Sequence, residues 1–469
     1  MLHPIDALRA RYGERYRWIL LFTVMAGNAS AGVSSASVGV AVPALAAHFG
    51  LGQDRVQWVS TAFMIAMMLG MLLTPWVIQR FGLRRAYLSA GGLLLAGALI
   101  SGFSPWFNLI VGARLVEGLG AGVMMPIPNV IVIRTFPGSE QGRAIGVFGF
   151  GVTLAPAAGP LLGGLLIDYF GWRAVFFMVV PMALATLWLA QRFLPRGSRN
   201  ESPPPLDWRG LAALGLGVPL LLNGLVELKG AAGAYPSLLI AAGAALLAAF
   251  VVHELRIPAP LFRLHIYARR AMAVGAAVSF VFGFSQVAVT YLLPVYLQHA
   301  LGYSASQAGL VMLPTVLALG LTLPIGGRVA DRIPSRYPIA GGLLLFALSI
   351  ALVGTPRIAA SFAAITIVAM LGRIGIGLML PALSLATVRR LPHEEVAHGA
   401  SMAAFMRQLG GAIGVPAAAV FLEWQLGAPG SSVNTLSPYT HTFVALALAC
   451  LPGALAGWFL EAKPRSRPR

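Results

Sequence analysis

The stretch GLGAGVMMPIPNVIVIRTFP (residues 118–137) recurs 255 positions later as RIGIGLMLPALSLATVRRLP (residues 373–392). Both copies carry glycines, a methionine, prolines and an arginine at the same spacing: Gly120, Gly122, Met124, Pro126, Arg134 and Pro137 match Gly375, Gly377, Met379, Pro381, Arg389 and Pro392. A shift of 252 likewise lays VIQRFGLRR (residues 77–85) on VADRIPSRY (residues 329–337). Agreement of this density indicates that the chain contains a duplicated unit.

The composition indicates which class of protein contains this duplicated unit. Hydrophobic residues make up 58% of the 469 residues and charged residues only 10%, which excludes a water-soluble globule. We count fourteen apolar windows of about 20 residues, the length that crosses a bilayer as a helix, with the fourth over residues 107–133. We therefore expect an all-α membrane protein without a soluble domain between its spans.

The basic residues predict how the chain is oriented in the membrane. The formal net charge is +18, and alternate loops divide Lys and Arg as 26 on one side against 4 on the other. Since basic loops stay in the cytoplasm, we expect a multi-pass protein of the bacterial inner (cytoplasmic) membrane with both termini cytoplasmic. The same distribution assigns the basic charge to topology and to lipid headgroups, and we expect no nucleic-acid partner.

The repeat and the apolar windows together predict three parts. Residues 1–194 form an N-terminal six-helix bundle, and residues 195–270 form a linker and two extra transmembrane helices. Residues 271–469 form a C-terminal six-helix bundle with a basic cytoplasmic tail. The linker RGSRNESPPPLDWR (residues 196–209) is rich in prolines and charges, which keeps it outside the lipid.

The fifth window contains the stretch GVTLAPAAGPLLGG (residues 151–164), which is unusually rich in residues that weaken helices. Ala155, Gly159 and Gly163 recur every four residues on one face, so that a neighbouring helix can approach closely. Pro156 and Pro160 each remove a backbone hydrogen bond and bend the helix. The stretch predicts a tightly packed hinge, although plain membrane packing explains small residues as well.

In these features the chain resembles the major facilitator superfamily, in its fourteen-helix drug:proton antiporter branch. The most specific likeness is to the antiporter motif of the fifth helix, here Gly151, Ala155, Pro156, Gly159, Pro160, Gly163 and Gly164. ARLVEGLGAG (residues 113–122) and RQLGGAIGVP (residues 407–416) resemble motifs of the fourth and the penultimate helix. The resemblance implies the major facilitator fold, with helices arranged 6+2+6 in two pseudo-symmetric bundles that work by alternating access.

The loops after the second and tenth windows resemble the gating loop of that superfamily. The second copy is complete at Gly327, Asp331 and Arg332. The first copy keeps Arg80, Gly82 and Arg84, but Gln79 replaces the acid.

Charged residues inside the spans are candidates for ion coupling, because burying them in lipid costs at least about 2.5 kcal/mol. Arg114 and Glu117 are three residues apart near the middle of the fourth span and share a helix face. The resembling proteins carry an acid in the first helix, where this chain has Ser34, and a glutamine where it has Glu117. We hypothesise that the proton-carrying carboxylate has moved to Glu117; an intrahelical ion pair without a transport role is the alternative.

A second group of residues predicts the wall of a substrate cavity, because methionines and aromatic rings repack around varied ligands. The candidates are Asn28, Ser34, Met64, Met68, Met124, Asn129, Phe282, Gln286, Tyr291, Arg373, Phe405 and Arg407. Packing within the bundle explains such residues equally. The excess of intramembrane arginine favours an anionic or zwitterionic substrate, unless Arg407 serves only to bond backbone carbonyls.

The sequence shows no catalytic, cofactor or metal motif: no HExxH, no Walker loop, and a single cysteine, Cys450. The resemblance to the antiporter branch implies a proton-coupled exporter of drugs or other amphipathic small molecules, with a role in antibiotic resistance. The alternatives are a selective metabolite exporter or a proton symporter of an anionic or zwitterionic compound; a scaffold or lipid-modifying enzyme is disfavoured. Expected partners are the substrate, protons and the bilayer, and a periplasmic adaptor, as some relatives use, is a further candidate.

Overall fold

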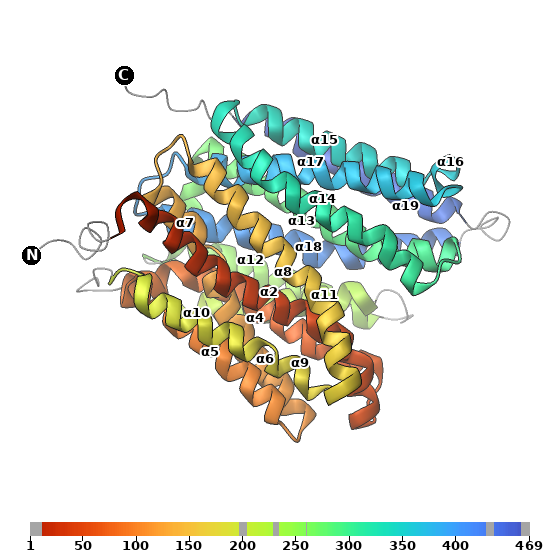
Figure 1. Cartoon of the computed structure of the whole chain (residues 1–469), viewed down its shortest axis with the longest axis horizontal. Coiled ribbons are helices and arrows are strands. Elements are labelled where there is room, and N and C mark those ends of the chain that lie inside the picture. Colours follow the sequence, from red (N-terminus) through yellow and green to blue (C-terminus); the bar gives the residue numbers. More distant parts are fainter. Residues whose placement is uncertain (1–11, 197–203, 228–233, 259, 428–435, 461–469) are drawn as a thin grey trace, which may run out of the picture.

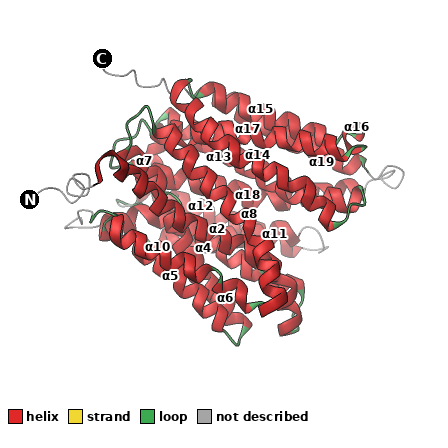
Figure 2. Ribbon diagram, in the orientation of Figure 1, coloured by secondary structure: helices red, strands yellow, loops and turns green. Residues whose placement is uncertain are grey.

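The computed structural model describes residues 12–196, 204–227, 234–258, 260–427 and 436–460. All regular structure in these residues is helical (Figure 2). Fourteen helical segments among them are long and apolar enough to cross a membrane. The predicted fold class, an all-α multi-pass membrane protein, is confirmed.

The first bundle is built from the segments before residue 194. Its elements are η1 (Gly13–Arg15), α2 (Tyr16–Phe49), α3 (Gln53–Val56), α4 (Trp58–Phe81), α5 (Leu83–Phe103), α6 (Phe107–Met124), α7 (Ile127–Thr135), α8 (Gln141–Phe170), α9 (Arg173–Phe177) and α10 (Val179–Phe193). The fourth span, expected to be continuous, is interrupted between α6 and α7. Pro126 and Pro128 have no N–H to donate to the preceding turn, which explains the break.

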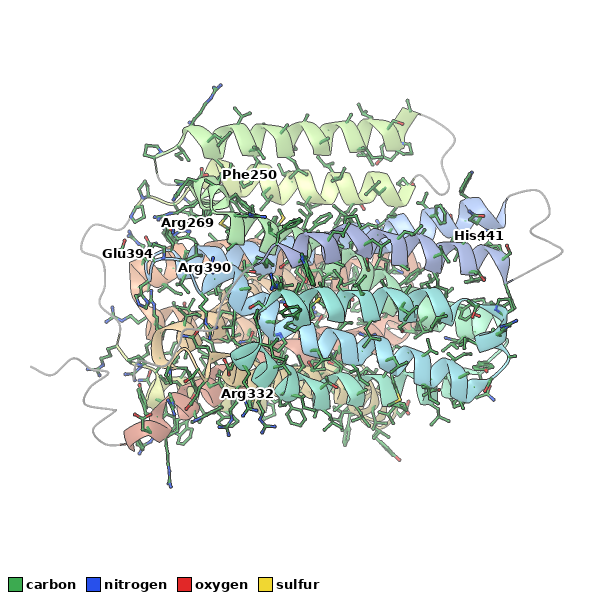
Figure 3. The ribbon with its side chains drawn as sticks, turned by 90° about the horizontal axis from the view of Figure 1, so that it is seen from above. Phe250, Arg269, Arg332, Arg390, Glu394 and His441 are labelled. Carbon is green, nitrogen blue, oxygen red and sulfur yellow. The ribbon has the colours of Figure 1, made fainter. Side chains whose placement is uncertain are left out.

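Two helices separate the bundles in sequence, α11 (Trp208–Glu227) and α12 (Ala234–Arg256). They pack on each other, and α11 also contacts α4 of the first bundle and α18 of the second. Figure 3 shows the pair lying beside the bundles, with Phe250 of α12 labelled. The inserted helices therefore cover one of the two seams between the bundles.

The second bundle repeats the first. Its elements are η2 (Leu264–Ala268), α13 (Arg270–Val295), the π-helical turn η3 (Tyr296–Ala300), α14 (Ala305–Arg332), α15 (Arg336–Val353), α16 (Pro356–Ala359), α17 (Phe362–Val388), α18 (Val396–Leu426) and α19 (Ser437–Trp458). With the inserted pair, the spans are arranged 6+2+6.

Glycine contacts show the pseudo-symmetry of the two bundles in detail. A Cβ at Gly120 would collide with the carbonyl of Ala90, and a Cβ at Gly375 with the carbonyl of Gly342. The two glycines lie 255 residues apart and the two carbonyls 252, which are the offsets of the sequence repeat. The repeat therefore marks helix contacts so close that no side chain fits between the backbones.

The same offsets recur two residues further along α6 and α17, on the faces turned to other helices. A Cβ at Gly122 would meet the carbonyl of Met67, and a Cβ at Gly377 would meet Thr322 and the carbonyl of Leu319. In a membrane, where lipid is as apolar as leucine, such close backbone contacts determine how helices pack. The duplicated motif thus fixes equivalent helix pairs in both bundles.

The bundles contact each other mainly at one end. Here α8 packs on α14, and Gly142 and Gly146 lie against Gly327 and the carbonyl of Leu323. Toward the other end of α8 the side chain of Tyr169 is exposed, and Figure 1 shows the bundles diverging in that direction. We call the contacting end the termini side, because α2 begins and α19 ends there (Figure 1).

Candidate functional site

The candidate site centres on two charged residues of α6. Arg114 and Glu117 project from one face of the helix, and Arg114 Nη1 lies 2.7 Å from Glu117 Oε2. Their side chains are 1% and 0% exposed, so the ion pair is fully buried. Removing one member of such a pair leaves an uncompensated charge, at a cost of about 3–5 kcal/mol. Each residue therefore stabilises the charged form of the other, and loss of either charge lowers the stability of the protein.

Ser34 of α2 completes this pair. Arg114 Nη1 donates a hydrogen bond of 2.8 Å to Ser34 Oγ, and Ser34 Oγ donates to Glu117 Oε1. Both carboxylate oxygens of Glu117 thus accept a hydrogen bond. Ser34 and Glu117 are two of the positions where the sequence departs from the pattern of the resembling family, and they touch each other.

The helix α4 supplies the remaining contacts of Arg114. Arg114 Nε donates to the carbonyl oxygen of Val59 at 3.1 Å. The guanidinium carbon lies 4.1 Å from the ring centroid of Phe63, a cation–π contact. These contacts fix the guanidinium from two further directions, so the charge pair is held by α2, α4 and α6 together.

Small residues let the neighbouring helices close over the pair. A Cβ at Gly97 of α5 would collide with the carbonyl of Ala113 and with Glu117, and a Cβ at Gly118 would collide with the carbonyl of Phe63. Larger residues at these positions would push α4 and α5 away from α6. The tight packing excludes water from the ion pair and strengthens its electrostatic interaction.

The predicted antiporter motif of α8 packs on the same turn of α2 that carries Ser34. A Cβ at Gly32 would collide with the ring of Pro156, and a Cβ at Gly159 would lie 3.2 Å from Ala36 Cβ. A Cβ at Gly163 would lie 3.3 Å from Ser37 Cβ. One turn of α2 therefore contacts Glu117 through Ser34 and contacts α8 through its small residues.

The other residues of this motif are less closely packed. Gly151 faces Met25 of α2, and Ala155 is half-buried. Pro160 is exposed, and a Cβ at Gly164 would meet open space. The helix α8 is continuous through both prolines. The motif thus has a packed face toward α2 and an open face, and its function as a hinge stays a prediction.

The second gating loop joins the two bundles on the termini side. Asp331, at the end of α14, accepts hydrogen bonds from the backbone N–H groups of Gly142 at 2.7 Å and Arg143 at 2.8 Å. These groups belong to the first turn of α8, where the helix dipole favours a negative charge. Arg389 Nη2 lies 3.7 Å from Asp331 Oδ1. We call this set the Asp331 junction.

Two arginines reach across this interface in equivalent ways. Arg134 donates to the carbonyl of His393 at 3.3 Å, and Arg389 donates to the carbonyl of Gly138. Donors and acceptors are both related by the repeat offset of 255. Arg389 Nε also donates to Gln141 Oε1 at 3.0 Å. The contact between the bundles is thus itself pseudo-symmetric.

The first gating loop makes a different contact. Gln79 Nε2 lies 3.1 Å from Nε2 of His398, in the first turn of α18. We call this contact the Gln79 junction. Gln79 corresponds to Asp331 by the offset of 252, and His398 corresponds to Arg143 by the offset of 255. A neutral pair of side chains therefore stands where the other junction has a carboxylate on a helix terminus.

The remaining residues of the gating loops range from exposed to buried. Arg332 is exposed, and the guanidinium carbon of Arg80 lies 5.8 Å from the ring centroid of Trp76. Gly82 ends α4 with φ of 77°, a conformation that favours glycine. Arg84 donates to the carbonyl of Gln191. These contacts stay within the first bundle, unlike those of Asp331.

The predicted cavity residues differ in their exposure in this conformation. Met68, Met124, Phe282 and Phe405 are buried in the bundle cores, and Ser34 belongs to the charge pair described above. Asn28 is buried and donates to the carbonyls of Val24 and Met124. Met64, Asn129 and Gln286 are half-buried, and Tyr291 is exposed. A shared substrate cavity stays a prediction for these residues.

The two intramembrane arginines of the second bundle are both half-buried. Arg373 Nη2 donates to Thr290 Oγ1 at 3.2 Å. Arg407 packs through its backbone on Gly283, where a Cβ would collide with the carbonyl of Arg407. Neither arginine forms an ion pair with a described residue. They are candidates to meet a negative charge that the second bundle does not supply.

The described residues contain no group of three or more His, Cys, Asp or Glu side chains placed to hold a metal ion. At the Glu117 site, a carboxyl group that bonds Ser34 and Arg114 can bind a proton and accept hydrogen bonds. The contacts of Glu117 with Ser34, and of Arg114 with Phe63, join helices that are distant in sequence. The one signal for them in the sequence was the departure from the family pattern at Ser34 and Glu117.

Comparison with known proteins agrees with the fold. A family model described as Major Facilitator Superfamily matches residues 24–415 and, in a second alignment, residues 275–469. The proton:xylose symporter XylE, solved with 6-bromo-6-deoxy-D-glucose bound, superposes with a TM-score of 0.69 at 14% sequence identity. The superposition covers 96% of this chain and 97% of that one, and at this identity it concerns the fold alone.

Two curated relatives have sequences close enough to align over most of their length. The multidrug resistance protein B homolog of Mycobacterium tuberculosis is 31% identical over 443 residues, which are 92% of this chain and 79% of the relative. The riboflavin transporter RibZ of Clostridioides difficile is 26% identical over 402 residues, which are 85% of this chain and 87% of the relative.

Proposed function

Because the chain belongs to the major facilitator superfamily, and is therefore a membrane transporter, we propose that it exports drugs or other amphipathic small molecules in exchange for protons. The likeness to the multidrug resistance protein B homolog supports this substrate class. The buried cluster of Ser34, Arg114 and Glu117 carries the proposal of proton coupling.

Protonation of Glu117 would change the balance of charge in the first bundle. Burial favours the neutral acid, whereas the adjacent guanidinium favours the carboxylate. Among the described residues, Arg114 forms an ion pair only with Glu117. A proton on Glu117 therefore leaves the buried guanidinium without its counter-charge, which disfavours the present packing and favours a rearrangement of α6 against α2 and α4.

The contact between α2 and α8 links that rearrangement to the motion of the bundles. Ser34 binds Glu117 from the turn of α2 on which Pro156 and Gly159 of α8 pack. The helix α8 also forms the contact with α14 of the second bundle. A change at Glu117 can thus reach the interface between the bundles through a short series of packed helices.

The conformation described here corresponds to one end of the transport cycle. We assign the termini side to the cytoplasm on the positive-inside rule, and the divergence at the other end then makes this state outward-facing. Glu117 is fully buried in this state. Proton exchange therefore needs an opening of the contact between α2 and α6.

Replacing Glu117 by glutamine tests the coupling. A glutamine oxygen can accept from Arg114 and its amide can bond Ser34, which offsets part of the cost of leaving the guanidinium without its counter-charge, so the variant is expected to fold with lower stability. Proteoliposomes with an imposed pH gradient should lose gradient-driven drug transport, while substrate exchange without a gradient persists. Glu227→Gln is the matched control, because Glu227 is exposed at the end of α11 and outside both bundles. Full gradient-driven transport by Glu117→Gln would refute the proposal.

A double variant sharpens this test. Ser34→Asp combined with Glu117→Gln returns the carboxylate to α2, within reach of the same guanidinium. If coupling needs a carboxylate next to Arg114, whether on α2 or on α6, the double variant should regain a substantial part of the gradient-driven transport. Failure of the double variant in a protein that still exchanges substrate would count against a movable carboxylate.

A second candidate function is selective transport of an anionic or zwitterionic metabolite, by export or by proton symport. Arg373 and Arg407 favour it, as two half-buried arginines without a carboxylate partner in the described residues. The likeness to a riboflavin transporter shows that related sequences carry metabolites. Susceptibility of cells with and without the protein to a panel of toxic cations, anions and zwitterions separates the two functions.

The predicted location is tested separately. A fluorescent protein fused after Leu460 should fluoresce and an alkaline phosphatase fusion should stay inactive if this end lies in the cytoplasm of a bacterial cell. The association with a periplasmic adaptor remains a prediction as well, and co-purification from crosslinked cells tests it.

A further inference from the structure

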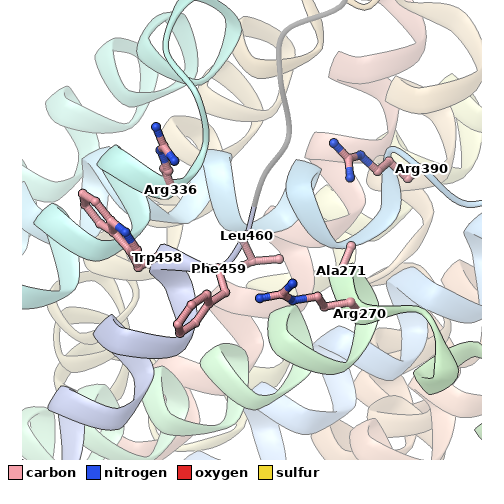
Figure 4. A pocket seen from close by; sticks show the side chains of 7 residues that line it. All are labelled: Arg270, Ala271, Arg336, Arg390, Trp458, Phe459 and Leu460. Carbon is pink, nitrogen blue, oxygen red and sulfur yellow. The ribbon is translucent and has the colours of Figure 1, made fainter.

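A cavity of about 350 Å3 opens on the termini side of the second bundle, and the residues described as lining it all belong to that bundle. Figure 4 shows the seven residues that line it: Arg270, Ala271, Arg336, Arg390, Trp458, Phe459 and Leu460. They come from the starts of α13 and α15, from the segment after α17 and from the end of α19. The cavity is thus formed where four spans end.

The lining is strongly basic. Three of the seven lining residues are arginines and none is acidic. Aromatic rings orient two of the guanidinium groups: that of Arg270 lies 5.3 Å from the ring centroid of Phe459, and that of Arg336 lies 5.6 Å from the ring centroid of Trp458. Arg336 Nη2 also donates to the hydroxyl of Tyr337 at 2.9 Å. The cationic groups are therefore held in place around one small volume.

The backbone adds to this positive potential. Arg270 is the first residue of the 26-residue helix α13, and Arg336 is the first residue of the 18-residue helix α15. The amino end of each helix carries a partial positive charge and backbone N–H groups that have no partner within the helix. Two helix termini and three guanidinium groups together favour a compact anion with several acceptor oxygens, of which a phosphate group is the best match.

The aromatic side of the cavity distinguishes a lipid from a soluble anion. Trp458 is the last residue of the span Ser437–Trp458 and is 50% exposed, and the neighbouring Phe459 is 56% exposed. Tryptophan at the end of a span lies at the level of the lipid headgroups. The cavity therefore has cationic groups for a phosphate and, next to them, an apolar surface at the depth of the glycerol backbone and upper acyl chains.

We propose that this cavity is a binding site for the phosphate of an anionic phospholipid, formed by Arg270, Arg336 and Arg390 with Trp458 and Phe459. Anionic lipid headgroups bind basic pockets between transmembrane helices in this way. A bound headgroup would join the starts of α13 and α15 to the end of α19. The site stabilises the second bundle independently of the proton coupling proposed for the first.

The test measures how well different lipids bind the purified full-length protein in detergent. Native mass spectrometry reports lipid retention, and thermal unfolding reports the Tm with each lipid. Phosphatidylglycerol should be retained and should raise Tm, whereas zwitterionic phosphatidylcholine should not. The double substitution Arg270→Gln and Arg390→Gln should weaken retention of phosphatidylglycerol about 30-fold, given about 1 kcal/mol for each basic residue near an anionic lipid. Both side chains are exposed, so the variant is expected to fold.

The control is Arg85→Gln combined with Arg256→Gln, which removes two exposed arginines outside the cavity. Retention of phosphatidylglycerol should not change in this variant. Equal losses in the two double variants would mean that only net charge matters and would overturn the site. Inorganic phosphate is the third arm: if it raises Tm as much as phosphatidylglycerol at the same concentration, the ligand is a free anion and the lipid assignment is wrong.

Discussion

The two junctions on the termini side occupy equivalent positions of the repeat, yet they differ in charge. At the Asp331 junction a carboxylate accepts two backbone N–H groups of α8 and lies near Arg389. At the Gln79 junction an amide and an imidazole make a single contact on α18. Charge-assisted hydrogen bonds contribute about 1.5–3 kcal/mol each and neutral ones about 1 kcal/mol. The contact between the bundles is therefore strong on one flank and weak on the other.

In the alternating-access cycle that we propose, this difference would give the duplicated fold a preferred order of opening. If both junctions were charged, the termini side would have to break two strong contacts at once before opening. With one weak junction, opening can begin at α4 and α18 while α8 and α14 stay together. The difference also makes the comparison testable, because each junction can be converted toward the other by one substitution.

Asp331→Asn should have the largest effect, because it removes the charge that caps α8 and attracts Arg389. We expect a loss of about 3 kcal/mol in the free energy that favours the closed termini side, or about a 100-fold rise in the open population. Distances between spin labels at the exposed positions Arg85 and Glu394, in a protein with Cys450→Ala, measure this population. An unchanged distance distribution would contradict the conclusion that the Asp331 junction is the stronger of the two contacts.

The next largest effect on the open population is expected for Arg389. Its symmetry-related counterpart, Arg134, should have a much smaller effect. Arg389→Gln loses the ion pair with Asp331 and the bond to Gln141, and should favour opening by about 2 kcal/mol. Arg134→Gln loses an exposed hydrogen bond to the carbonyl of His393 and should cost less than about 0.5 kcal/mol. The same label pair reports both. Equal effects would show that the flanks are energetically alike.

Gln79→Asp should act in the opposite direction by making the weak junction resemble the strong one. The new carboxylate would face His398 and the amino end of α18, and should stabilise the closed termini side by about 1 kcal/mol. Transport should slow by about fivefold, measured as turnover in proteoliposomes, if opening on this flank limits the cycle. Faster turnover would indicate that the flank does not open first.

His398→Ala should produce a smaller change than Asp331→Asn or Arg389→Gln. It removes one neutral side-chain contact with Gln79, which is worth about 0.5–1 kcal/mol. The label distances should shift slightly toward the open population, and His398→Asn should restore them because an amide can again pair with Gln79. A loss as large as that of Asp331→Asn would reverse the order of the two junctions.

The sequence alone predicted the parts of the fold that depend on composition and repetition. Apolar windows gave the number of spans, and the offsets of 255 and 252 identified contacts that the glycines Gly120 and Gly375 make in space. The break between α6 and α7 was not predicted. It requires knowing that Pro126 and Pro128 together remove two N–H donors within one turn, whereas the prolines of α8, four residues apart, are accommodated in a continuous helix.

The candidate site was only partly predictable. The spacing of Arg114 and Glu117 places both on one helix face, and local geometry suffices for that conclusion. The bond from Ser34 spans 83 residues of sequence and depends on the rotation of α2 about its axis. A helix that is apolar all round gives no periodic signal for that rotation. The contact of Gln79 with His398 is even harder to predict from the sequence, because it depends on which end of the transporter is closed.

The position of α11 has a consequence for molecules that reach the transporter from the lipid phase. This helix packs on α4 and α18 and screens one flank of the protein from the bilayer. On the opposite flank, α8 and α14 diverge beyond their contact and expose leucine side chains, Leu161 and Leu165 on α8 and Leu310 and Leu313 on α14. A hydrophobic compound dissolved in the membrane can therefore enter from one side of the protein rather than from two. It would enter next to α8, whose small residues pack on α2.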